Sequence, residues 1–227
     1  MKTNQSLITA LAFLAFASPA LASQDYKIVS HTSDDTGIRF DVPYTAGTHH
    51  GFSKAVAGDI VINLDPIEAR SVALKIPITS MTTGDTTRDC HMRESLGINY
   101  AGSRFPGEHV CDANHQLPSS GPDSVVYSNV ELTILRIEGA ATTLDVGKSA
   151  TVTATVRMGI HGVTKDFTIP LKIDSTASAA PGAAPKLHVS STYPVLLSDF
   201  GIVVKPFLFI KVSNQMTVKI DLNLEPK

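Results

Sequence analysis

Apolar and polar residues alternate through most of the chain. A period of two is typical of β-strands that have one buried face and one solvated face. The alternation predicts strands over six segments, namely 60–65, 72–79, 129–134, 151–158, 167–174 and 216–224. Many short strands with little helix favour an all-β sandwich or a closed antiparallel barrel, and the alternation alone does not separate the two. A barrel of about eight strands has an interior wide enough for one small ligand.

Breaks in the alternation predict the connections. Pro77 and Pro170 lie inside strand-like runs, and we expect an edge, a bulge or a strand end there because proline donates no ladder hydrogen bond. The segment Ser175–Pro185 is rich in Ala, Ser, Pro and Gly, which predicts a long surface loop between two paired strands. A short helix is expected over Thr86–Leu96.

The N-terminus has the pattern of a secretory signal peptide. Lys2 precedes an apolar stretch from Leu7 to Ala17, which is too short to span a bilayer as a helix. Pro19 and the small-x-small pattern of Ala20-Leu21-Ala22 follow, as in a cleavage site. We therefore expect a signal peptide over residues 1–22, export, and one mature domain over residues 23–227. A membrane anchor or a buried helix is the alternative, and no later segment is apolar for long enough to span a bilayer as a helix.

Charge and motif content argue against several function classes. The formal net charge is −2 and no block of like charge occurs, so we expect no capture of nucleic acid or of an anionic membrane surface. Gly-x-Ser-x-Gly, His-Glu-x-x-His and phosphate-binding glycine loops are absent from the sequence. Asp34 and Asp35 fall in an expected loop and are read as a solvated pair. We accordingly expect a protein that is not an enzyme.

The two cysteines, Cys90 and Cys111, allow three interpretations. In an exported protein, an even number of cysteines favours a disulfide. Free thiols are the second interpretation. The third is a metal site, because His91 and His109 lie beside the cysteines, although their spacing is closer than is usual in structural zinc sites. Adjacent His49 and His50 would point to opposite faces of a strand, which argues against a shared metal.

Several motifs resemble those of the YceI-like family. Met81–Gly84 precedes Arg88–Met92, and Phe105-Pro106 follows as the start of a strand. The turn His161–Lys165 and the segment Asp199–Ile202 complete the set in the order that the family shows. The chain is similar to this family over most of its length after about residue 45.

The resemblance implies an extended antiparallel lipocalin-like β-barrel in the periplasm. It implies a non-covalent polyisoprenoid, quinone or other long fatty amphiphile as ligand, with no other cofactor and no bound metal. A homodimer is left open. The residues that we expect to contact the ligand are Ile78, Met81, Arg88, Asp89, His91, Met92, Phe105, Met158, His161, Phe167 and Phe200.

Structural interpretations of these residues stay open beside the ligand-binding one. Arg88 and Asp89 could fix a loop by hydrogen bonds, and the methionines could be ordinary core residues. His161 could be a turn residue before Gly162, whose missing side chain permits a positive φ. For the whole protein, the alternatives are a metal- or haem-associated redox accessory protein, a filled barrel that acts through protein partners, and an esterase.

Overall fold

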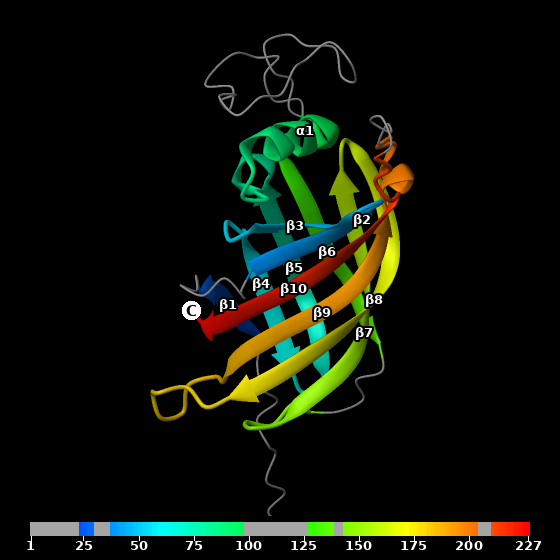
Figure 1. Ribbon diagram of the computed structural model, residues 1–227. Coiled ribbons are helices and arrows are strands. Elements are labelled where there is room, and N and C mark those ends of the chain that lie inside the picture. The colour runs from blue at the N-terminus through cyan, green and yellow to red at the C-terminus, as the bar shows by residue number, and fades with distance from the viewer. Residues whose placement is uncertain (1–22, 30–36, 98–126, 139–142, 204–209) are drawn as a thin grey trace, which may run out of the picture.

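A computed structural model describes residues 23–29, 37–97, 127–138, 143–203 and 210–227 (Figure 1). The strands are β1 (Gln24–Val29), β2 (Gly37–Tyr44), β3 (Gly47–Ser53), β4 (Ala57–Leu64), β5 (Ile67–Pro77), β6 (Asn129–Glu138), β7 (Ser149–Ile160), β8 (Val163–Thr176), β9 (Lys186–Leu196) and β10 (Gln215–Pro226). The helices are the 3-10 turns η1 (Ile78–Ser80) and η2 (Leu197–Phe200) and the α-helix α1 (Thr86–Leu96). Within these ranges, no helix is long and apolar enough to cross a membrane.

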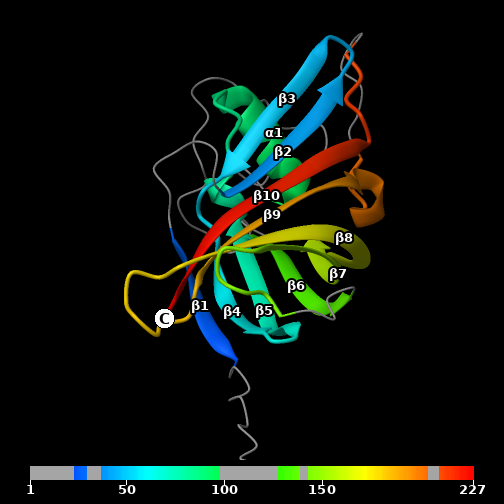
Figure 2. The same ribbon diagram turned by 90° about the horizontal axis from the view of Figure 1, so that it is seen from below.

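Eight antiparallel strands close into a barrel. Their order is β1-β4-β5-β6-β7-β8-β9-β10, and β1 also pairs with β10, which closes the ring. The predicted lipocalin-like β-barrel of about eight strands is therefore confirmed. The hairpin of β2 and β3 was not predicted. It pairs with the N-terminal half of β10, while β1 pairs with the C-terminal half, so the hairpin extends outside the closed ring (Figure 2).

Two bulges keep apolar side chains inside the ring. Between β4 and β5, Val61 is opposite Ser71 and Ile62 is opposite Ala69, so Arg70 is passed over. Between β6 and β7, the register passes over Leu135, which is 42% exposed. A strand gains one residue at a bulge, and the side chains beyond it change face. This change turns Ala69 and Ile137 inward, where strict alternation would have turned them outward.

The two prolines lie where the ladder allows them. Pro77 is the last residue of β5. Pro170 pairs with β7 on one side, and on the other side the pairing of β8 with β9 begins only at Lys172. Among the described residues, each proline thus has one side without a neighbouring strand, where no backbone N–H donor is needed. This agrees with the predicted edge or strand-end positions. The loop after β8 is shorter than expected, because Ser175 and Thr176 still pair with β9.

Helix α1 spans the predicted residues and lies at one end of the barrel (Figure 1). Asp85 begins the helix, because its carboxylate accepts a hydrogen bond from the Arg88 backbone N–H at 2.8 Å. Gly97 ends the helix with φ of 122°, a conformation that favours glycine. The segments 1–22 and 98–126 lie outside the described residues, and so do the predictions for the signal peptide, Phe105, His109 and Cys111.

Candidate ligand cavity in the barrel

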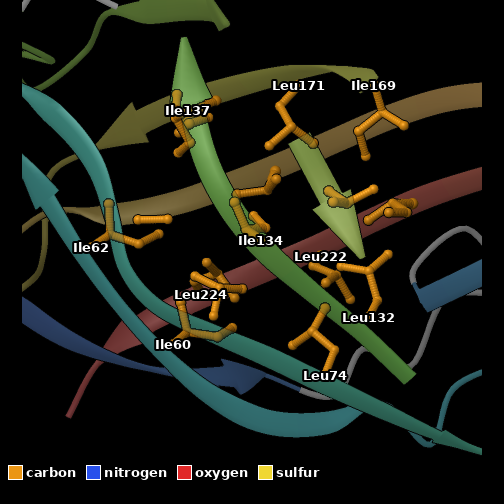
Figure 3. Close-up of a pocket in the computed structure, with 16 residues that line it drawn as sticks. Ile60, Ile62, Leu74, Leu132, Ile134, Ile137, Ile169, Leu171, Leu222 and Leu224 are labelled. Atoms are coloured by element: carbon orange, nitrogen blue, oxygen red, sulfur yellow. The ribbon is translucent and has the colours of Figure 1, made fainter. Parts of the chain in front are cut away.

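Sixteen side chains of the described residues line a cavity inside the ring, and all sixteen are apolar. They come from every strand of the ring except β1, and Figure 3 shows the labelled ones converging. They are Ile60, Ile62, Ala69, Val72, Leu74, Leu132, Ile134, Ile137, Val156, Ile169, Leu171, Ile173, Val189, Ile220, Leu222 and Leu224. An apolar wall of this kind binds hydrocarbon and gives no hydrogen bond to a polar group.

The cavity is narrow. Its volume is about 50 Å³. That space exceeds what a single water needs, but an apolar cavity of this kind is expected to stay dry. It accommodates a few methylene groups, so a longer chain requires lining side chains to change rotamer.

Two tyrosines face the interior next to this wall. Tyr26 of β1 is directly opposite Ile60, which lines the cavity. Tyr193 of β9 is directly opposite Val218, the next inward residue of β10 after Ile220. Both side chains are buried, and burial raises the pKa of Tyr26 to about 12 and raises that of Tyr193 as well.

One group of predicted ligand residues surrounds α1 instead of the cavity. Ile78 and Met81 are buried in and after η1, and the Met81 carbonyl accepts hydrogen bonds from the Arg93 side chain. Asp89 is buried and accepts hydrogen bonds from the Thr82 hydroxyl and from the Thr83 amide and hydroxyl, each at 2.6 Å. The Asp89 carboxylate thus fixes the segment before the helix, which is the structural role that the sequence left open.

A second group fills the barrel interior near η2. Phe167 of β8 and Phe200 of η2 are in edge contact, with ring centroids 5.8 Å apart. Met158 of β7 is directly opposite Leu132 and is the next inward residue after Val156, and both of those residues line the cavity. Met158 is thus a predicted ligand residue that lies next to two residues of the cavity wall, Leu132 and Val156. None of the predicted residues in the described ranges is itself part of that wall.

The remaining predicted ligand residues of the described ranges lie on α1 and in the β7–β8 turn. The His91 side chain is 58% exposed, and its Nδ1 is 3.6 Å from a carboxylate oxygen of buried Glu94. Arg88 and Met92 are partly buried on α1. His161 occupies the β7–β8 turn with φ of 53° and contacts the Tyr127 ring, as a turn residue would. Their role in ligand binding stays a prediction.

The cysteine pair is only half inside the described part of the chain. Cys90 is buried in α1, and no cysteine in the described ranges is free. Because Cys111 lies outside those ranges, the bridge between the two stays a prediction. Among the described residues, no group of three or more His, Cys, Asp or Glu is placed to hold a metal ion.

The sequence pattern predicted most of the inward-facing residues but not the cavity between them. Alternation placed all lining residues on the inward faces of the predicted strands except Ala69, Ile137 and Val189. Ala69 and Ile137 follow the two bulges, and Val189 belongs to the strand expected after the Ser175–Pro185 loop, for which no inward face was assigned. Tyr26 and Tyr193 were also missed, since a single tyrosine in a strand carries no signal of its direction.

Comparisons with known proteins agree with the fold. Residues 120–224 match the family model described as the YceI-like domain, a range that contains the motifs His161–Lys165 and Asp199–Ile202. None of the curated proteins matches the chain.

Two solved structures share the barrel. One is a polyisoprenoid binding domain from Saccharophagus degradans implicated in plant cell wall breakdown, with a TM-score of 0.57 and 16% identity, over 89% of this chain and 98% of that one. The other is BcnA of Burkholderia cenocepacia, with a TM-score of 0.53 and 13% identity, over 82% of this chain and 93% of that one. At these identities, the likeness establishes the fold.

Proposed function

Because the chain carries a YceI-like domain over residues 120–224, we propose that it is a binding protein for a long isoprenoid, quinone or similar amphiphilic lipid. The lipid tail occupies the barrel cavity and is shielded there from water. The protein acts in the periplasm after export, as the signal-peptide pattern of residues 1–22 predicts. Binding, without turnover, is the proposed activity.

The wholly apolar wall of the cavity carries this proposal. A hydrocarbon chain gains about 0.8 kcal/mol for each methylene group that leaves water. Among the described residues the wall consists only of Ile, Leu, Val and Ala side chains, so none of them opposes that gain by leaving a polar group unpaired. The likeness to a polyisoprenoid binding domain supports the same class of ligand.

Blocking the cavity tests the proposal. Ala69 has the smallest side chain in the wall, and the substitution Ala69→Phe places a ring in the space of the ligand. Ala73 lies on the same strand but is exposed, so Ala73→Phe adds the same ring outside the barrel. The measurement is the uptake of a fluorescent isoprenoid by delipidated protein, with circular dichroism as the check that each variant is folded.

We expect Ala69→Phe to weaken uptake at least about tenfold and Ala73→Phe to leave it unchanged. A ring in a narrow site also strains the core, so Ala69→Leu is the milder variant if the first does not fold. Equal uptake by wild type, Ala69→Phe and Ala73→Phe would place the lipid elsewhere and would contradict the proposal.

A further inference from the structure

Besides the buried Ser175 hydroxyl on β8, two buried tyrosine hydroxyl groups lie next to the cavity wall without a hydrogen-bond partner among the described residues. They belong to Tyr26, whose side chain is 0% exposed, and to Tyr193, which is 4% exposed. Buried polar groups in native proteins are nearly always paired, and an unpaired one destabilises the fold. An unpaired buried hydroxyl therefore requires an explanation, such as a ligand that is bound in the working protein.

The register places the two tyrosines next to different parts of the cavity wall. Tyr26 on β1 is opposite Ile60 of β4, which lines the cavity. Two residues further along β1, Ile28 is opposite Leu224, which also lines the cavity. Tyr193 of β9 is opposite Val218, which lies beyond Ile220 in the N-terminal half of β10. Because β10 runs between them, the apolar wall at Ile220, Leu222 and Leu224 separates the two tyrosines.

The chemistry of the two groups limits what they recognise. Burial raises the pKa of both tyrosines, so each hydroxyl is neutral and able to donate at physiological pH. The described residues of the cavity wall include no Lys, Arg or His to neutralise an anion. Burying an unpaired charge is far more costly than burying a neutral polar group, so this interior favours a neutral oxygen over a phosphate.

We propose that the Tyr26 and Tyr193 hydroxyl groups are hydrogen-bond donors to neutral oxygen atoms of the bound lipid, and that they select lipids with a carbonyl or hydroxyl group over pure hydrocarbons and lipid phosphates. This inference rests on the proposed lipid-binding function. The apolar wall holds the tail, and one or both tyrosines hold the oxygen-bearing part of the ligand.

Tyrosine-to-phenylalanine variants test this selection, because they remove the hydroxyl and keep the ring. The variants are Tyr26→Phe, Tyr193→Phe and the double variant. Tyr44→Phe is the matched control, since Tyr44 lies on β2 outside the closed ring and stacks on His49. The probes are menaquinone-4, geranylgeranyl phosphate and squalene, which are a neutral quinone, an anion and a hydrocarbon with isoprenoid chains.

We expect wild-type protein to bind menaquinone-4 more tightly than the other two probes. Loss of one neutral hydrogen bond weakens binding by a factor of about two to ten, so at least one single variant should show this loss for menaquinone-4 and none for squalene. The affected variant should be as stable as the wild type or more stable when lipid-free, because it no longer buries an unpaired hydroxyl. Tyr44→Phe should change neither property.

Three other results would overturn the inference. Equal losses for menaquinone-4 and squalene would assign the tyrosines to ring packing. Unchanged affinities together with a destabilised lipid-free protein would show that buried waters pair with the hydroxyls. Tighter binding of geranylgeranyl phosphate than of menaquinone-4 by wild type would contradict the selection for a neutral oxygen. Failure of all three probes to bind wild-type protein would instead contradict the proposed function itself.

Discussion

The Arg93 guanidinium donates two hydrogen bonds to the carbonyl oxygen of Met81, from Nε at 3.1 Å and from Nη2 at 2.6 Å. Met81 follows η1 at the end of β5, while Arg93 lies in the last turn of α1. Buried Asp89 lies one helical turn before Arg93, with 3.8 Å between the Asp89 carboxylate and Nη2. These contacts attach the helix to the end of the barrel, so α1 forms part of the fixed structure there.

Replacement of Asp89 by asparagine should loosen this attachment. The amide retains the shape but loses the charge that accepts hydrogen bonds from Thr82 and Thr83. Hydrogen bonds to a charged group contribute about 1.5–3 kcal/mol, so we expect the free energy of unfolding to fall by about 2–3 kcal/mol in urea denaturation. Asp145→Asn, at an exposed residue, is the control with little expected change. Equal effects of the two variants would show that Asp89 does not hold the segment.

Gly162 in the β7–β8 turn should tolerate alanine less well than Gly182 does. Their φ angles are 75° and 76°, so both variants have the same backbone strain. A Cβ at Gly162 would lie 2.4 Å from the Tyr127 ring, while a Cβ at Gly182 would meet nothing within 4 Å. We expect Gly182→Ala to cost about 1 kcal/mol and Gly162→Ala to cost more in thermal unfolding. The excess should vanish in the Tyr127→Ala background, and an excess that persists there would exclude the ring as its cause.

Acid should remove a contribution from Asp174 on β8. Hydrogen bonds from Lys172 and then from Ser149 lower the Asp174 pKa from 3.8 to about 2. A carboxyl whose folded pKa is lowered stabilises the fold above its unfolded pKa, and the effect is lost as the pH falls from about 4 to about 2. Asp174→Asn should therefore lower the free energy of unfolding at pH 7. The loss should not exceed about 1 kcal/mol, because solvent screens the ion pair of Asp174 with Lys172. In urea denaturation the difference from wild type should shrink below pH 4, and a constant difference would refute this origin.

The predicted Cys90–Cys111 bridge gives non-additive variants. Such a bridge closes a loop of about 20 residues and stabilises by about 3 kcal/mol in the chain-entropy model. Cys90→Ala, Cys111→Ala and the double variant should thus each be destabilised by a similar amount in denaturant. Additive losses in the double variant, or intact wild-type protein whose mass does not rise by two hydrogens on reduction, would argue for free thiols.

The predictability of this protein from its sequence differs between the barrel and its site. Alternation in residues such as Leu132 and Ile134 is a local signal, so strands and their inward faces could be predicted. The bulges at Arg70 and Leu135 could not, since a bulge depends on the pairing of two strands and leaves no reliable mark in either. The β2–β3 hairpin was missed because His49-His50-Gly51 interrupts any apolar face there.

The candidate site was harder to predict for the same reason. The family motifs pointed to Asp89 and His91. Asp89 holds the segment before α1 by hydrogen bonds, and the His91 side chain faces solvent. The cavity wall consists of residues that look like any other core side chains, such as Ile169 and Leu171. Only the closed ring shows that these side chains leave space between them, and no local pattern encodes that space.

Native mass spectrometry of the exported protein, purified without detergent and followed by organic extraction, tests the central claim most directly. The proposed function predicts an adduct of lipid mass at a ratio of one to one, which extracts as an isoprenoid-type species and is lost in Ala69→Phe but not in Ala73→Phe. A clean mass for the lipid-free chain that stays unchanged after incubation with menaquinone-4 would contradict the claim that the barrel holds a lipid.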